Sequence, residues 1–268
     1  PKVSILLLSN TDDISAENIK QHWQQHQDDE LLTCTNPKKN IATRFNTLAK
    51  KAQGDILIFA DAQLKPEPGC VEQLLAYSIR KDIGLVTGKL IYNDAKLHSC
   101  GLTLGIRACA GFWHYGCHSD DLGYGGWMSI NHEVSAVPWQ LMAVKKQLFV
   151  QAGLFDEHYR KQGFDVHLAL QLKKMTSLKH LAIVSAKAVF PTPCPPAVDL
   201  WEHADFMRLW GYWKKPLSQK DPFFNPNLSI YNESIRFIAA DEQRLKYFGA
   251  FNVYDRQTAQ LLWQCFKP

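Results

Sequence analysis

Short apolar segments alternate with helix-like segments through the first part of this 268-residue chain, and this alternation limits its fold most strongly. The segment 3–8 is almost entirely apolar, which is typical of a strand buried on both faces of a parallel sheet. Helix-like segments at 15–27 and 41–52 alternate with further strand-like segments at 30–35 and 55–59. Parallel strands are joined by long crossovers that usually contain a helix. The alternation therefore predicts an α/β fold with a mostly parallel central sheet flanked by helices.

The chain after residue 60 is less regular. It predicts a helix at 71–80, short strands at 85–87 and 89–92, strand-like character at 135–145, and a helical turn at 147–152. The intervening stretch, from about 93 to 132, is rich in Gly, His and aromatic residues, and such long loops in compact domains are usually functional.

Two further segments affect how the chain divides into domains. Residues 163–174 alternate like a strand but contain helix-forming residues, so periodicity leaves both assignments open. A proline cluster at 191–196 excludes regular structure there, and the end of the chain has helical character. We predict one principal domain over 1–232 and a helical tail over 233–268.

Composition excludes several classes of protein. The hydrophobic content of 46% suffices for one large core, and no apolar run approaches the length of a membrane span. The net charge of +4 comes from scattered Lys and Arg residues, which does not favour nucleic-acid binding but is compatible with peripheral attraction to anionic lipid. The seven cysteines are odd in number and include no C-x-x-C pair, which predicts reduced thiols rather than a disulfide framework or a zinc site. We expect a soluble, cytoplasmic protein, with possible association at the inner face of the membrane.

Two acidic positions about a hundred residues apart suggest a site. Asp61 follows the apolar segment 55–59, and Asp165 stands at the start of the ambiguous segment 163–174. A carboxylate at the carboxyl edge of a buried strand reaches the crevice where open α/β sheets bind ligands, and one at a helix start can face it. This arrangement suits transfer of a group away from a phosphate leaving group. The alternatives are a turn role for Asp61 and a helix cap for Asp165.

Nine short motifs between residues 2 and 229 occur in the order found in one enzyme family. They lie at 2–7, 44–46 with 52–55, 59–63, 88–92, 98–101, 135–137, 153–157, 165–172 and 221–229. Through them the chain resembles family 2 glycosyltransferases, which have an A-type glycosyltransferase fold. The resemblance is to the branch that builds bacterial O-antigen and rhamnose-containing polysaccharides.

The resemblance implies an inverting enzyme that moves a sugar from a nucleotide-sugar donor to a saccharide or lipid-linked acceptor. In such enzymes an Asp-x-Asp motif holds Mg²⁺ or Mn²⁺ at the donor diphosphate. Asp61 matches the first carboxylate, but the second position is Gln63, and Thr192-Pro193 stands where the branch commonly supplies a histidine. The same family places three βα steps before this motif and a base-binding Asp after its second strand. Only two steps fit here, so a unit is missing or precedes residue 1. If segment 3–8 is the family's first strand, the base-binding Asp is absent; if it is the second, Asp12 or Asp13 lies near its place.

The resemblance also assigns the acceptor side. Asp165 matches the catalytic base, although Phe164, His167 and Gln171 replace the family's polar neighbours. Further site candidates follow from matching positions: Trp139, Asp156 and Glu157 for acceptor binding, with His98 and His167 as additional candidates. Alternatively, Asp156 and Glu157 have a capping role and His98 has a structural role. The departures from the family pattern also keep open a rival function, a catalytically inactive binding or scaffold module in a polysaccharide assembly protein.

Overall fold

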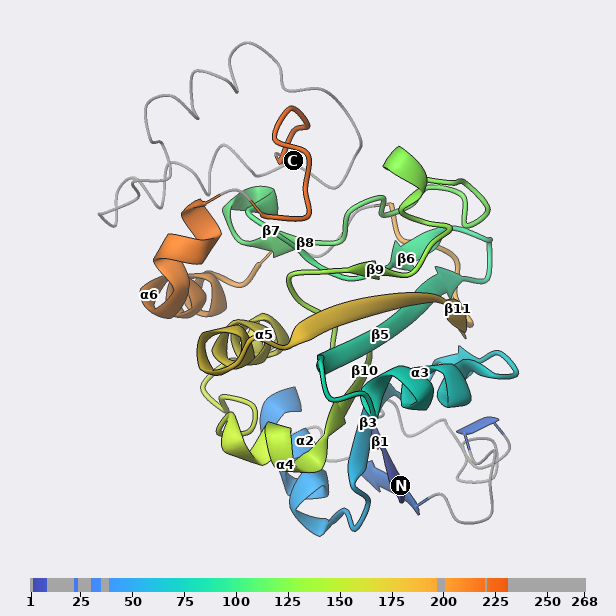
Figure 1. The fold of residues 1–268 in the computed structure, drawn as a ribbon, viewed down its shortest axis with the longest axis vertical. Helices are drawn as coiled ribbons and strands as arrows, with labels where there is room; N and C mark the ends of the chain where they lie inside the picture. Colours follow the sequence, from blue (N-terminus) through green and yellow to red (C-terminus); the bar gives the residue numbers. More distant parts are fainter. Residues whose placement is uncertain are drawn as a thin grey trace.

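The computed structural model describes residues 2–8, 22–23, 30–34, 39–196, 201–219 and 221–230, and shows a mixed sheet covered by helices on both faces (Figure 1). The strands are β1 (Val3–Leu8), β2 (Glu30–Cys34), β3 (Ile56–Asp61), β4 (Lys65–Pro66), β5 (Ile83–Tyr92), β6 (Leu97–Ser99), β7 (Thr103–Leu104), β8 (Ala110–Gly111), β9 (His132–Glu133), β10 (Leu141–Lys145) and β11 (Lys179–Phe190). The helices are α2 (Ile41–Lys51), α3 (Cys70–Ser78), α4 (Lys146–Gln151), α5 (Phe164–Met175) and α6 (His203–Ser218), with the 3-10 turns η1 (Ile106–Ala108) and η2 (Tyr124–Gly126).

The main sheet has the strand order β2-β1-β3-β10-β5-β11-β4. Strand β1 pairs in parallel with β2 and β3, and β5 pairs in parallel with β11. Strand β10 lies between these two parallel groups and is antiparallel to both of its neighbours. The predicted α/β class with helices around a central sheet is confirmed. The antiparallel strand at its centre was not anticipated.

Both faces of the sheet are buried, as the apolar segment 3–8 predicted. Leu6 and Leu8 belong to the core cluster that includes residues of α2, α4, α5 and α6, whereas Ile5 and Leu7 belong to the cluster on the α3 side. Successive side chains of a strand point to opposite faces, so a strand covered on both sides is mostly apolar. The exception in β1 is Ser4, whose buried hydroxyl accepts the Gly54 N–H (2.8 Å).

Two local predictions are settled by packing. The strands predicted at 85–87 and 89–92 are one strand, β5, because Gly88 is not a break: a Cβ there would lie 2.2 Å from the Ala186 carbonyl oxygen of β11. The ambiguous segment 163–174 is helix α5. Its strand-like alternation arises because the helix is buried around most of its circumference, so apolar residues are not confined to one stripe.

Some predictions fall outside the described residues. Only His22 and Trp23 of the predicted helix 15–27 are described, and both are helical. Asp12, Asp13 and the predicted tail 233–268 lie outside, so the division at residue 232 stays a prediction. The six cysteines in the described segments form no disulfide. No helix in the described segments is both long enough and apolar enough to span a bilayer.

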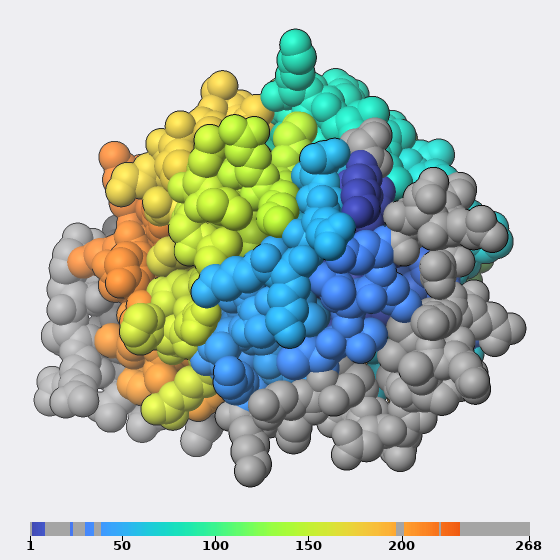
Figure 2. Space-filling model, turned by 90° about the horizontal axis from the view of Figure 1, so that it is seen from below, coloured from blue at the N-terminus to red at the C-terminus, as the bar shows by residue number. Residues whose placement is uncertain are grey.

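Helix α2 is joined to the loop that precedes α5. Asn46 donates a hydrogen bond from Nδ2 to the Phe155 carbonyl oxygen (2.8 Å) and accepts one at Oδ1 from the Phe155 N–H (3.1 Å). Figure 2 shows the same juxtaposition at the surface, where the blue α2 region lies against the yellow-green region that contains α4. Two of the sequence motifs, 44–46 and 153–157, are therefore partners in one tertiary contact.

Candidate functional site

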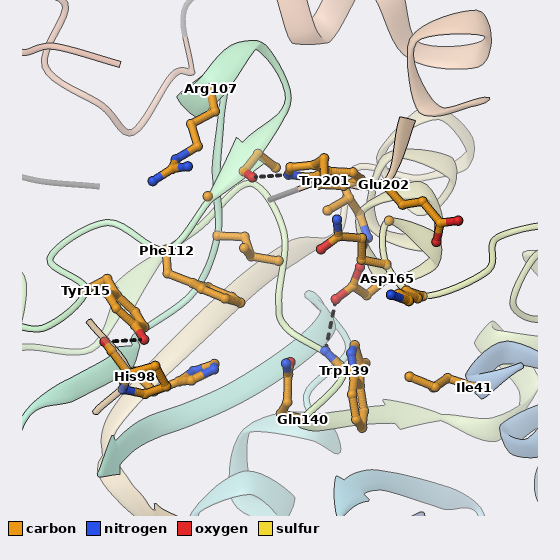
Figure 3. A pocket seen from close by; sticks show the side chains of 18 of the residues that line it. Ile41, His98, Arg107, Phe112, Tyr115, Trp139, Gln140, Asp165, Trp201 and Glu202 are labelled. Carbon is orange, nitrogen blue, oxygen red and sulfur yellow. Dashed lines mark hydrogen bonds between the residues drawn. The ribbon is translucent and has the colours of Figure 1, made fainter. Parts of the chain in front are cut away.

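A cavity of about 770 Å³ opens where β5 and β11 end, and it is the candidate site. Its lining includes Tyr92 from the end of β5, Trp139 and Gln140 from the segment before β10, Asp165 from α5, and Pro195 from beyond β11. Figure 3 shows side chains from these separate segments around one space. The carboxyl edge of an open α/β sheet is where such folds bind ligands.

Asp165 is a buried carboxylate within this lining, with 6% of its surface exposed. It stands in the first turn of α5, after Gly163, which adopts a left-handed conformation (φ 94°). Its Oδ2 accepts the Trp139 N–H (3.1 Å), the dashed line between them in Figure 3, and its Oδ1 accepts the Val166 N–H (2.9 Å). Burial raises the pKa of Asp165 to about 6, although these N–H donors favour the charged form.

Asp61 ends β3 and is connected to the same wall of the cavity. Its N–H donates to the Gln140 carbonyl oxygen (3.0 Å), and its Oδ1 accepts the Gln63 N–H (2.9 Å). Burial raises the pKa of Asp61, opposed by the Gln63 N–H and by the charge of Arg44. Asp61 does not line the cavity, but it and Asp165 are each one hydrogen bond from the adjacent residues Gln140 and Trp139. Asp61, through its backbone N–H, and Asp165, through its carboxylate, therefore contact the same dipeptide.

The donor set around Asp61 supplies little for a metal ion. Gln63 offers an amide in place of a carboxylate, and Thr192 and Pro193 are exposed beyond the end of β11. In the described ranges, no three His, Cys, Asp or Glu side chains are grouped as a metal site requires. Mg²⁺ and Mn²⁺ prefer oxygen ligands and are usually held by one or two carboxylates together with substrate phosphates. Asp61 is a single carboxylate, so the described residues do not form a site that would hold a metal without help from substrate phosphates.

Trp139 combines a backbone role with a place in the lining. Its N–H holds Asp165, and its indole ring packs edge-on against Phe45 with ring centroids 5.8 Å apart. The side chain is buried except for 9% of its surface, and it contributes to the cavity wall. It lies beside Asp165, and its predicted contact with an acceptor stays a prediction.

Asp156 and Glu157 do not line the cavity. Asp156 forms an ion pair with Arg208 of α6 (2.6 Å) and contacts His158 (2.8 Å). The pKa of Asp156 is lowered overall. Burial acts to raise this pKa, but the hydrogen bonds from His158 and Arg208 outweigh burial. Glu157 accepts hydrogen bonds from Asn46 (2.9 Å) and Thr43 (3.1 Å) of α2, which lower its pKa. Both carboxylates are engaged in holding this loop to neighbouring helices.

The two candidate histidines have different positions. His98 lines the cavity and is buried, and burial lowers its pKa to about 3, so it is neutral at physiological pH. It packs against Phe112 and Phe190 at centroid distances of 4.6 and 5.0 Å. His167 is not in the lining. Its Nδ1 accepts the indole N–H of Trp213 (3.2 Å), which ties α5 to α6.

Sequence reasoning did not identify several lining residues. Arg107, Phe112 and Tyr115 come from the irregular stretch 93–132, and Trp201 comes from the segment before α6. Arg107 has a left-handed backbone conformation (φ 52°, ψ 38°), which is uncommon outside glycine and is found disproportionately at functional sites. For Arg107, Phe112 and Tyr115 the only sequence signal was the length and composition of the irregular stretch. Trp201 lies outside it and was one of several tryptophans that could stack on a sugar ring.

Comparison with known proteins gives a family match. The family model described as "Glycosyl transferase family 2" matches residues 2–136. An O-antigen biosynthesis protein, RfbC of Myxococcus xanthus, is 25% identical over 191 residues, covering 69% of this chain and 15% of that protein. The uncharacterized protein y4gI of Sinorhizobium fredii is 22% identical over 210 residues, covering 71% of this chain and 22% of that protein. The chain thus spans less than a quarter of the length of either curated relative.

A solved structure has the same fold. The crystal structure of GalNAc-T7 with UDP, GalNAc and Mn²⁺ superposes with a TM-score of 0.56 at 11% identity, covering 80% of this chain and 48% of that chain. At this identity the likeness concerns the fold, an α/β nucleotide-sugar transferase fold, and not the ligands.

Proposed function

We propose a transferase activity for this chain, which belongs to glycosyl transferase family 2. In this proposal it transfers a sugar from a nucleotide-sugar donor to a hydroxyl group of an acceptor bound beside Asp165. The observation that carries this proposal is a buried carboxylate in the wall of a large cavity at the carboxyl edge of the sheet. A carboxyl group with a pKa of about 6 is ionised at neutral pH, yet it is more basic than an exposed Asp.

In this proposal Asp165 is the general base. It takes the proton from the acceptor hydroxyl as that oxygen attacks the anomeric carbon, and the bond from that carbon to the nucleoside diphosphate breaks. A single displacement of this kind inverts the anomeric centre. The Trp139 N–H and the Val166 N–H fix the two carboxylate oxygens, so the base is oriented before the acceptor binds.

The acceptor side of the cavity suits a saccharide. Trp139, Phe112 and Trp201 present aromatic surface, which packs well against the C–H faces of sugar rings. We propose a saccharide or lipid-linked acceptor in cell-surface polysaccharide synthesis, supported by the similarity to the Myxococcus xanthus protein. We place this reaction in the cytoplasm, at the inner face of the membrane where a lipid-linked acceptor would be presented.

On the donor side, Asp61 and Gln63 are proposed to lie beside the diphosphate. The Gln63 amide can donate hydrogen bonds to phosphate oxygens, which a carboxylate at that position cannot do. GalNAc-T7 was crystallised with Mn²⁺, so a divalent metal is compatible with the fold. Because this chain offers one carboxylate and one amide here, we assign no step to a metal.

The test is titration calorimetry and a transfer assay with UDP, dTDP and GDP sugars, with and without Mn²⁺. Nucleotide-sugar binding by the wild type, with donor hydrolysis or transfer that is lost in Asp165→Asn, supports the proposal. The substitutions at Gln63 and Thr192 favour one rival, an inactive binding or scaffold module. If no donor binds, the proposed transferase activity is rejected in favour of the inactive binding or scaffold module.

A further inference from the structure

One wall of the cavity is a small hairpin whose stability needs explanation. Among the described residues, strands β7 and β8 pair with each other in a separate two-stranded sheet, and Leu102, just before β7, forms a single bridge to Ala136. The turn between them carries Arg107, and β8 contributes Ala110 and Gly111 to the cavity lining. A lone two-stranded hairpin is at best marginally stable in water, so its position depends on groups outside it.

Residues 221–230, called the strap below, supply such groups. The strap forms neither helix nor strand, yet Asp221, Phe224 and Leu228 are buried. The Asp221 carboxylate accepts the Leu104 N–H of β7 at Oδ2 (2.7 Å) and the Phe223 N–H of the strap at Oδ1 (2.9 Å). It joins strap and hairpin, as a neighbouring strand would do through its carbonyl groups.

The other end of the strap holds the turn of the hairpin. The Ile230 carbonyl oxygen accepts the Arg107 N–H (2.8 Å), and the indole N–H of Trp210 in α6 donates to the Ala108 carbonyl oxygen (2.6 Å). Arg107 and Ala108 both have left-handed backbone conformations (φ 52° and 59°). Such residues cost of order 1 kcal/mol or more each and persist only where surrounding contacts fix them.

The middle of the strap reaches the segment that contains two further lining residues, Phe112 and Tyr115. Phe224 packs edge-on against Trp113 with ring centroids 4.7 Å apart, and the Asn225 side-chain amide donates to the Tyr124 hydroxyl. Ile106, Trp113, Phe224 and Leu228 form a small core cluster of their own. The strap therefore contacts both segments that make this wall.

We propose that the strap sets the shape of the acceptor-side wall and that Asp221 is a positioning residue for acceptor binding. The assignment of this wall to the acceptor rests on the proposed function. Asp221 does not line the cavity, so its effect passes through the hairpin and Arg107. The sequence motif 221–229, which no catalytic role explains, has a physical purpose in this arrangement.

Hydrogen exchange of the full chain, followed by mass spectrometry, tests the structural half. In Asp221→Ala we expect exchange across residues 103–112 to accelerate at least tenfold, with β5 unchanged. Asn227→Ala is the matched control, because Asn227 is an exposed residue of the same strap, and it should match the wild type. Unchanged exchange at 103–112 in Asp221→Ala overturns the proposal.

A second variant covers the case in which Asp221→Ala does not fold. Asn225→Ala removes the contact to Tyr124 and the hydrogen bond that Asn225 Oδ1 accepts from the Asn227 N–H (2.9 Å). Outside the strap itself, we expect faster exchange at residues 112–126. No change there in a folded protein also overturns the proposal.

Kinetics test the functional half. In Asp221→Asn, which keeps the side-chain shape and loses the charge, we expect at least a fivefold rise in acceptor KM with the rate of donor hydrolysis unchanged. An unchanged acceptor KM together with altered exchange at the hairpin overturns the positioning role. The two proposals can fail independently. A wild type without transferase activity refutes the proposed function. The exchange experiment needs no turnover, so it still decides whether the strap stabilises the hairpin.

Discussion

Replacing Asp165 with Asn should change the pH dependence of stability in a direction opposite to the usual one for a carboxylate. The folded state raises the pKa of Asp165 from 3.8 to about 6, so folding favours the protonated form. The unfolded chain releases this proton more readily, and the free energy of unfolding therefore falls as pH rises from about 4 to 6. The effect is complete and constant above about pH 7, where the group is ionised in both states.

The size of the effect follows from the two pKa values. Between pH 4 and pH 7.5 the ionisation of Asp165 removes about 2 kcal/mol from the free energy of unfolding, using 1.36 kcal/mol per pKa unit. Asn cannot ionise, so the stability of Asp165→Asn relative to the wild type should improve by about 2 kcal/mol over this range. If the amide of the Asp165→Asn variant interacts less well with the Trp139 N–H, this destabilisation is the same at every pH. It therefore does not affect the change in relative stability between pH 4 and pH 7.5.

The assay is urea unfolding of both proteins at pH 4, 5, 6 and 7.5, monitored by tryptophan fluorescence. Asp156→Asn is the matched control, because its pKa is lowered in the folded state and its contribution is lost as pH falls. The same Asp165→Asn protein should lose transfer activity by a factor of about 10² to 10⁴, the usual worth of a general base. A relative stability that does not vary with pH would show that Asp165 is not buried as an ionisable group, and the argument for a tuned base would fail.

Three further predictions follow from other parts of the site. Gln63→Asp restores a second carboxylate beside Asp61 and should raise Mn²⁺ affinity at least tenfold by calorimetry; an unchanged affinity would mean that the site geometry, and not the missing charge, limits metal binding. Trp139→Leu removes an aromatic face and should raise acceptor KM about two- to tenfold with a smaller change in donor KM, whereas equal changes would exclude a specific acceptor contact. Lys89 is buried and donates to the carbonyl oxygens of Ser119 (2.6 Å) and Met128 (2.8 Å). Lys89→Met should therefore lower the free energy of unfolding by about 2 kcal/mol and speed hydrogen exchange across 117–129. An equally stable variant would contradict this anchoring role.

The sequence predicted the parts of the fold that depend on local pattern. Strands β1, β2 and β3 and helices α2 and α3 lie where the pattern indicated. All but the edge strand β2, which is only partly buried, bury an apolar face whose period is visible in the residues. Pattern failed where burial was unusual. Gly88 looked like a break because its role, to admit the backbone of β11, depends on a residue almost a hundred positions away.

The candidate site divides in the same way. Asp165 and Trp139 were found through motifs, and the structure connects them by one hydrogen bond. Arg107 had no motif, because its position depends on the Ile230 carbonyl and on the Trp210 indole, both supplied more than a hundred residues later. Lining residues that are fixed by long-range backbone contacts leave no local signal in a single sequence.

The antiparallel direction of β10 explains how Asp61 and Asp165, far apart in the sequence, come to contact one dipeptide. Asp61 ends a strand that runs toward the site, so a parallel neighbour would also present its carboxyl end there. Because β10 runs the opposite way, the residues just before it, Trp139 and Gln140, stand at that edge instead. The Gln140 carbonyl oxygen then accepts the backbone N–H of Asp61, and the Trp139 N–H donates to the carboxylate of Asp165. A shift of this dipeptide must therefore disturb the proposed donor and acceptor sides together, which a purely parallel sheet would not require.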